Sequence, residues 1–260
     1  MAIAAIRHRT MHISPDLIPL LLILAAFLAG FIDSIAGGGG LITVPALILA
    51  GLPPVVALGT NKLQSLFGSA SATMTYAAKG LVNLKAQYKM ALISAGGSAI
   101  GALVATNVSS DWLRAVLPVI MIAIAVYFLV KPNLSDEDRV QRMTPLIFSA
   151  TLVPAIGFYD GIFGPGTGSF FMLGFVLLAG FGVLKATAHT KLLNFASNIG
   201  AFIIFAFSGA IQWKIGLMMG AAQFFGAQLG AHVAMKSGAK LIKPLLVTVC
   251  LALAAKLLFT

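Results

Sequence analysis

The chain has 260 residues, of which 59% are hydrophobic and only 9% are charged, and its mean hydropathy is +1.00. A soluble domain carries about 25% charged residues, so this chain lacks the residues to build a water-exposed surface. The composition excludes an ordinary soluble enzyme, a nucleic-acid-binding protein and a disordered chain. The net charge of +10 therefore indicates either basic cytoplasmic loops of a membrane protein or an anionic substrate. The single cysteine, Cys250, excludes an intrachain disulfide.

The N-terminal region has features that are typical of a cleavable signal peptide. Arg7 and Arg9 precede an apolar run at 17–28, and small residues follow it. We reject this interpretation because the next segment, 30–37, has a counterpart in the second half of the chain. A cleaved leader would not carry half of an internal repeat.

The chain is an internal duplication. Segment 30–37 recurs at 157–164, an offset of 127 positions from Gly30 to Gly157, and two extra residues in the second copy then change the offset to 129. At the second offset Lys62 matches Lys191, and further matches stay in register. The most polar stretch joins the copies and is typical of a linker. We predict a first transmembrane repeat at 1–130, a cytoplasmic linker at 131–142 and a second transmembrane repeat at 143–260.

Each copy contains the same series of apolar segments, and none shows the alternation of a strand. They run roughly 17–36, 41–51, 57–79, 86–107 and 112–130 in the first copy, and roughly 144–163, 168–181, 183–208, 213–235 and 241–259 in the second. Most have ~20 residues, which is enough to span a membrane as a helix.

The second segment of each copy is too short to span the membrane, and it follows a glycine-rich break at 37–40 or 164–168. Glycine and proline interrupt helices. We therefore predict a discontinuous element in each copy, in which a helix, an unwound turn at membrane depth and a half-helix follow one another. Unwound backbone is tolerated there only where it is buried or lines a cavity.

The basic residues predict the orientation of the copies. In the first copy they flank the loop after the third segment, at Lys79, Lys85 and Lys89. In the second copy they follow the fourth segment instead, at Lys236, Lys240 and Lys243. Matching loops then face opposite sides, which favours inverted repeats, with parallel repeats as the alternative. The linker would lie inside and both termini outside, although Arg7 and Arg9 favour the opposite for the N-terminus.

The sequence thus predicts an all-α fold, a polytopic membrane helix bundle of two inverted repeats. Each repeat contains a glycine-broken helix, and we expect about 8–10 transmembrane segments in all. Whether the short second segment of each repeat spans the membrane or is re-entrant stays open.

Two lysines lie inside apolar segments, Lys62 and Lys191. A lysine at the centre of a membrane helix costs ~2.5–3.5 kcal/mol, unless it meets an anion or a water-filled cavity. The alternative is that each side chain snorkels to the headgroups. Polar residues spaced i, i+4, i+8 beside each lysine favour an anion, because this spacing places them on one helix face. The candidate substrate-binding residues are Asn61, Lys62, Ser65, Ser69, Thr190, Lys191, Asn194 and Asn198.

Asp33 and Asp160 are the acidic residues well inside apolar segments, each four residues before the first glycine of its break. Two roles compete: an ion pair with Lys62 or Lys191, or a proton that couples transport. They could also cap the broken backbone. The breaks themselves could offer N–H groups to an anion at the start of each half-helix. The glycines concerned are Gly37, Gly38, Gly39, Gly40, Gly164, Gly166 and Gly168.

Other motifs have structural interpretations. The GxxxG pairs Gly97–Gly101 and Gly226–Gly230 predict close helix packing. His189 is either a hydrogen-bonded core residue or a proton relay. No metal-ligand spacing and no set of nucleophile, base and acid is visible in the sequence. We therefore expect no metal, no cofactor and no catalytic residue.

The motif at 33–40, followed by 59–62, resembles the TauE/SafE sulfite exporter family of membrane permeases. A looser second copy of the motif lies at 164–168 and 190–191, and the resemblance covers nearly the whole chain from Leu17 to Phe259. It implies secondary transport of sulfur-containing anions such as sulfite, sulfoacetate or other organosulfonates. It also implies a bacterial inner-membrane location.

We expect a secondary transporter that exports such an anion, with proton coupling left open. The alternative is a passive anion channel that uses the same lysine pair. An intramembrane enzyme is disfavoured because no catalytic set is visible. The expected partners are a small anionic substrate and the lipid bilayer, with a homodimer as an open alternative and no nucleic acid.

Overall fold

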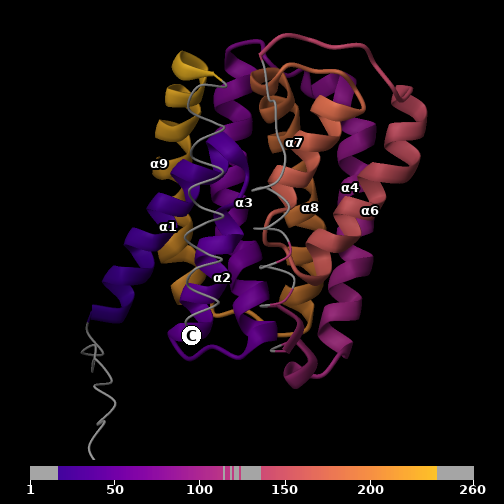
Figure 1. The fold of residues 1–260 in the computed structure, drawn as a ribbon. Helices are drawn as coiled ribbons and strands as arrows, with labels where there is room; N and C mark the ends of the chain where they lie inside the picture. Colours follow the sequence, from indigo (N-terminus) through magenta and orange to yellow (C-terminus); the bar gives the residue numbers. More distant parts are fainter. Residues whose placement is uncertain (1–16, 114, 118, 120–122, 124–135, 239–260) are drawn as a thin grey trace, which may run out of the picture.

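The computed structural model describes residues 17–113, 115–117, 119, 123 and 136–238, and Figure 1 shows its helices. The first copy forms α1 (Leu17–Ala36), α2 (Gly39–Leu49), α3 (Pro54–Ala78) and α4 (Leu84–Asn107). The second copy forms α6 (Pro145–Ile162), α7 (Thr167–Leu177), α8 (Val183–Phe207) and α9 (Trp213–Ser237). Both copies therefore follow one order: a long helix, a short helix and two long helices. No strand occurs within the described ranges, and the predicted all-α class is confirmed.

Four of these helices, α1, α4, α6 and α8, are long and apolar enough to cross a membrane. Helices α3 and α9 have 25 residues each and are also long enough, but they carry more polar side chains. The fifth apolar segment of the first copy lies mostly outside the described residues, and that of the second copy lies wholly outside them. The number of spans and the exact repeat boundaries stay predictions.

The predicted glycine breaks are confirmed at the ends of α1 and α6. Gly37 follows α1 with a φ of 73°, and Gly164 follows α6 with a φ of 85°. Only glycine adopts this left-handed conformation without steric cost, so both helices stop at equivalent positions. The half-helices that follow, α2 and α7, have 11 residues each, which is ~16 Å or about half of a bilayer core.

The GxxxG pairs place helices in direct backbone contact, as predicted. A Cβ atom built on Gly226 would lie 2.1 Å from the carbonyl oxygen of Phe27, and one on Gly230 would lie 2.3 Å from that of Phe31. These contacts join α9 to α1, and the two helices run in the same direction. Gly97 and Gly101 join α4 to α6 in the same way, against the carbonyl oxygens of Pro154 and Phe158.

The remaining contacts fix the directions of the other helices. Helix α3 runs parallel to α9, with Leu63 against Gly216 and Phe67 against Gly220. Helix α4 runs parallel to α8, while the start of α3 lies against the end of α8 at Gly59. Helices α1, α3 and α9 therefore run one way and α4, α6 and α8 the other.

Equivalent helices of the two copies thus run in opposite directions. Figure 1 shows α1 rising from the lower left and α6 descending from the upper right. These directions support the inverted-repeat hypothesis over parallel repeats. The placement of the repeats across a membrane stays a prediction.

Basic side chains gather at one end of the described helices. The linker from 136 to 144 lies at this end, where the Arg139 N–H donates to the Gly180 carbonyl at 2.7 Å. The basic residues at this end are Lys79, Lys85, Lys89, Arg139, Arg142, Lys185 and Lys236. Among the described charged residues, the opposite end has Asp111 and Lys214. By the positive-inside rule we expect the linker end to be cytoplasmic.

Single-cysteine labelling tests this orientation in a background where Cys250 is replaced by serine. We expect Glu137→Cys to react only from the cytoplasmic side, and Ser109→Cys and Ser208→Cys only from the periplasmic side. All three positions are exposed, so the substitutions should not disturb packing. Labelling of Glu137→Cys and Ser109→Cys from the same side would contradict the topology.

Candidate functional site

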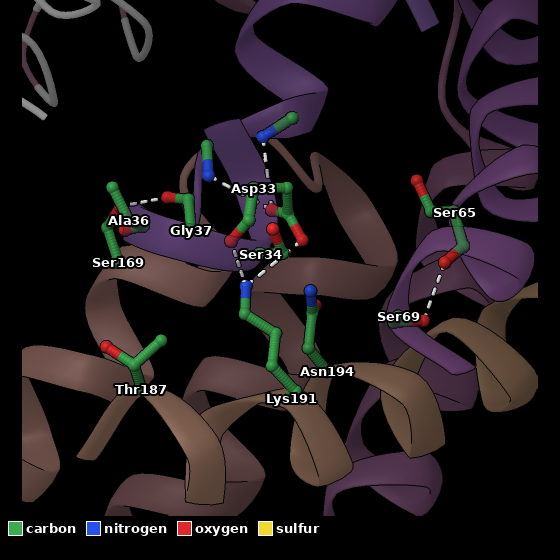
Figure 2. Close-up of polar contacts among 12 residues, drawn as sticks. Asp33, Ser34, Ala36, Gly37, Ser65, Ser69, Ser169, Thr187, Lys191 and Asn194 are labelled. Atoms are coloured by element: carbon green, nitrogen blue, oxygen red, sulfur yellow. Dashed lines mark hydrogen bonds and ion pairs between the residues drawn. The ribbon is translucent and has the colours of Figure 1, made fainter. Parts of the chain in front are cut away.

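The two helix breaks meet near the centre of the molecule. Gly37 packs against the backbone of Gly168, and the Ser169 hydroxyl donates to the carbonyl oxygen of Ala36 at 2.9 Å and also to that of Gly37. Figure 2 shows this junction beside Asp33 and Lys191. The contacts join the end of α1 to the start of α7, so the two copies share one centre.

A small cavity of about 20 Å³ lies at this junction. Its volume is enough for about one water molecule. The lining residues come from both copies and from both breaks. They are Asp33, Gly38, Gly39, Gly40, Asn61, Ser65, Asp160, Gly164, Gly166, Thr167, Gly168, Asn194 and Asn198.

Lys191 and Asp33 form one buried ion pair across the copies. The Lys191 Nζ lies 3.1 Å from the Asp33 Oδ2, and it also donates to the main-chain carbonyl of Asp33. The Asp33 Oδ1 accepts the N–H groups of Gly38 at 3.0 Å and Gly39 at 3.1 Å. Asp33 therefore forms an ion pair and also caps the half-helix α2, two of the roles that the sequence left open.

Lys62 and Asp160 form the second pair, with the Lys62 Nζ 2.7 Å from the Asp160 Oδ1. Each pair joins a lysine of one copy to an aspartate of the other. The Lys62 and Asp160 side chains are 1% and 2% exposed, and that of Lys191 is 0% exposed. The snorkelling interpretation is therefore wrong, because both ammonium groups point inward and neither reaches the surface.

The predicted polar stripes only partly face the cavity. Asn61, Ser65, Asn194 and Asn198 line it, and Figure 2 shows Asn194 beside Lys191 and directed toward Asp33. Ser69 lies one turn beyond and donates to the Ser65 carbonyl at 2.6 Å.

Four further predicted positions are buried but do not line the cavity. Thr190 is buried with an unpartnered hydroxyl, and Gly37 is buried in the junction. The ammonium groups of Lys62 and Lys191 lie directly behind Gly164 and Gly168.

Three residues that support the site were missed in the sequence. Thr167 lines the cavity and donates its hydroxyl to the Gly164 carbonyl at 2.7 Å. Thr43 and Gln64 donate to the Asn61 Oδ1 at 2.6 and 2.9 Å, which fixes that amide. Thr167 lies inside the second glycine break, and this position could have indicated its role.

The electrostatics of the cavity combine two opposing features. The N-termini of α2 and α7 both reach it, and helix N-termini carry a partial positive charge. At α2, Asp33 already accepts the N–H groups of Gly38 and Gly39. The four buried charges, however, sum to zero, because each lysine is paired with an aspartate. The sequence left open whether these lysines pair with aspartates or meet an anion, and in the structure each lysine is paired with an aspartate.

His189 lies away from this junction. Its ring contacts those of Phe175 and Phe181, with centroids 5.6 and 4.9 Å apart, and it lines a separate cavity of about 150 Å³ near the linker. This placement favours the core interpretation over a proton relay. Within the described ranges, no group of three or more His, Cys, Asp or Glu side chains could hold a metal ion.

Comparisons with known proteins agree with this architecture. The family model for the sulfite exporter TauE/SafE matches residues 22–257. The chain is 66% identical over 237 residues to the probable membrane transporter protein ORF9 of Sinorhizobium sp, covering 91% of each chain. It is 47% identical over 247 residues to the probable membrane transporter protein YfcA of Escherichia coli (strain K12), covering 95% of this chain and 91% of that protein.

A more distant relative is the sulfite exporter TauE/SafE family protein 6 of Arabidopsis thaliana, which is 32% identical over 103 residues, covering 39% of this chain and 24% of that protein. No solved structure matches the chain. With its apolar spans, the protein is a multi-pass membrane transporter, which confirms the predicted class and membrane location. The chain belongs to the TauE/SafE sulfite exporter family.

Proposed function

We propose that this protein moves a small sulfur-containing anion across the bacterial inner membrane as a secondary transporter, not as an enzyme. The substrate class is sulfite, sulfoacetate or another organosulfonate, and the direction is export, as the family description suggests. One observation carries the proposal: two half-helix N-termini meet at a single cavity between the copies, and two buried lysines lie behind its lining.

The lining chemistry suits an oxyanion with several oxygens. Asn61, Asn194 and Asn198 bring amide groups and Ser65 brings a hydroxyl, while the helix termini bring backbone N–H groups. Broken helices that meet at the interface of inverted repeats are a recurrent design of transporter sites. A lysine behind the lining that exchanged its aspartate partner for the anion would supply the charge that neutral donors lack.

The small volume of the cavity favours a transporter over a channel. A sulfonate is larger than the single water molecule for which the cavity has room, so the two breaks must move apart to admit it. Flux in proteoliposomes separates the two functions. A transporter can accumulate labelled substrate against its own gradient when an excess of unlabelled substrate flows the other way, whereas a passive channel cannot.

Lys62→Gln is expected to weaken anion affinity about tenfold to a hundredfold, because one charge-assisted hydrogen bond contributes ~1.5–3 kcal/mol. Glutamine keeps polarity and approximate length but removes the charge. Saturation of sulfite or sulfoacetate flux in proteoliposomes measures the change. Lys85→Gln removes the same charge at an exposed position and serves as the matched control. Unchanged affinity of a folded Lys62→Gln variant would place the anion site elsewhere.

A further inference from the structure

The two buried ion pairs are built unequally. Asp33 has both carboxylate oxygens engaged, one by Gly38 and Gly39 and the other by Lys191. Asp160 has only the contact of its Oδ1 with Lys62, and its Oδ2 is buried without any hydrogen-bond partner. One aspartate is thus fully satisfied and its repeat equivalent is not.

The sequence explains this difference. In the first break, Gly38 follows the left-handed Gly37 and donates its N–H to Asp33. In the second break, Pro165 follows the left-handed Gly164 at the equivalent position, and proline has no N–H. Two extra residues also displace the start of α7. Asp160 therefore lacks the backbone donors that hold Asp33.

The two lysines also differ in the number of their polar partners. Lys191 donates to the Asp33 carboxylate and also to the Asp33 main-chain carbonyl. Lys62 approaches the Asp160 Oδ1 at 2.7 Å but has no second polar partner. A buried charge that lacks hydrogen bonds is costly. Lys62 and Asp160 are therefore the pair that can separate, so that each group takes another partner.

The charged groups around Asp160 are few. Lys62 faces it from α3, and Asp33 lines the same cavity from α1 with its charge compensated by Lys191 from α8. Helices α4 and α7 bring the neutral Ser98 and Thr167 to this region. Tyr159 on α6 itself donates its hydroxyl to the Pro165 carbonyl. Lys62 is therefore the partner whose contact changes if Asp160 becomes neutral.

We infer that Asp160 takes up one proton when the substrate anion binds, and that Asp33 with Lys191 is a fixed structural pair. The proton adds to the unpartnered Oδ2 of Asp160 and converts the carboxylate to a carboxylic acid. Lys62 keeps its own protons, loses its carboxylate partner and becomes the counter-ion of the anion. This inference rests on the proposed transport function and assigns its coupling residue.

The charge balance gives the stoichiometry. The four buried groups sum to zero before binding, and one proton plus one monovalent anion add zero. A monovalent sulfonate would therefore move together with one proton, without net charge transfer. The anion would leave the cell with a proton when its outward gradient dominates, and an inward proton gradient would drive its accumulation.

Proton uptake on binding tests the inference directly. Purified protein in weakly buffered detergent solution, with a pH-sensitive dye, is titrated with methanesulfonate, which stays ionised throughout the pH range, while calorimetry records binding. We expect wild-type protein to take up one proton per bound anion. We expect Asp160→Asn to bind methanesulfonate without proton uptake, because asparagine imitates the protonated acid.

A second variant adds a hydrogen-bond donor and leaves Asp160 itself unchanged. Pro165→Ala restores the missing N–H beside Asp160, which favours the charged carboxylate. Proton uptake should therefore require a lower pH than in the wild type.

The outcomes separate this inference from the proposed function. Failure of the wild type to bind methanesulfonate, sulfite or sulfoacetate would overturn both. Binding by the wild type without proton uptake, or uptake that persists in Asp160→Asn, would overturn the inference and leave the transport function intact. Where Asp160→Asn fails to fold, the wild-type titration and the pH shift of Pro165→Ala decide.

Discussion

Gly101→Ala is expected to destabilise the protein by ~1–3 kcal/mol or more, because it adds a methyl group where two helix backbones touch. The new Cβ would lie 2.1 Å from the Phe158 carbonyl oxygen and 3.0 Å from the Ile162 nitrogen. Neither atom belongs to a side chain that can rotate away. Helices α4 and α6 would have to move apart, which would also displace Asp160 on α6.

Gly96→Ala on the same helix is the matched control. A Cβ at Gly96 meets no atom within 4 Å. Replacing glycine by alanine in a helix interior stabilises it by ~0.5–1 kcal/mol, so this variant should be at least as stable as the wild type. Melting temperature in detergent, followed by size-exclusion chromatography, measures both variants. Equal melting temperatures for Gly101→Ala and Gly96→Ala would contradict the backbone-contact argument.

The helix breaks and close contacts could be predicted because their signals are local. A run of glycines interrupts a helix wherever it occurs, so the predicted half-helix at 41–51 matches the observed α2 closely. The predicted 168–181 begins one residue after α7 does but extends beyond its end at Leu177, because the apolar run continues into the α7–α8 loop. The GxxxG spacing likewise belongs to one helix and needs no knowledge of its partner.

The crossed ion pairs could not be predicted, because pairing depends on how the two copies fit together. The sequence was compatible with an ion pair between Asp33 and either Lys62 or Lys191, and in the structure Asp33 pairs with Lys191. The difference between the two pairs, by contrast, is marked in the sequence by Pro165. Pro165 can be interpreted in this way only when the hydrogen bond from the Gly38 N–H to Asp33 is known.

The supporting residues Thr43 and Gln64 were missed for a related reason. Hydroxyl and amide groups occur throughout helix α3, and nothing in their spacing distinguishes Gln64. Thr43 is the single polar side chain of the apolar helix α2, and a lone threonine there does not by itself indicate a role. Their role follows from one shared acceptor, the Asn61 Oδ1, which only the packing of α2 against α3 brings within reach.

Breaking the Asp33–Lys191 pair should have the largest effect on folding of any single change at the site. Removing one partner of a buried ion pair costs ~3–5 kcal/mol, because the other charge stays buried and uncompensated. Asp33→Asn isolates this effect, since the asparagine Oδ1 can still accept the Gly38 and Gly39 N–H groups and keep the cap of α2. We expect low folded yield and a large fall in melting temperature.

The double variant Asp33→Asn, Lys191→Gln should recover much of that loss, because no unpaired charge remains. Asp160→Asn should be destabilised less than Asp33→Asn, because a neutral Asp160 is a state that the transport cycle visits. Methanesulfonate should stabilise it further by pairing with Lys62. Melting temperatures of the three variants, with and without this anion, provide the measurement. If Asp33→Asn melts like the wild type, or if the double variant is no more stable than Asp33→Asn, the charge of this pair is not what holds the two helix breaks together.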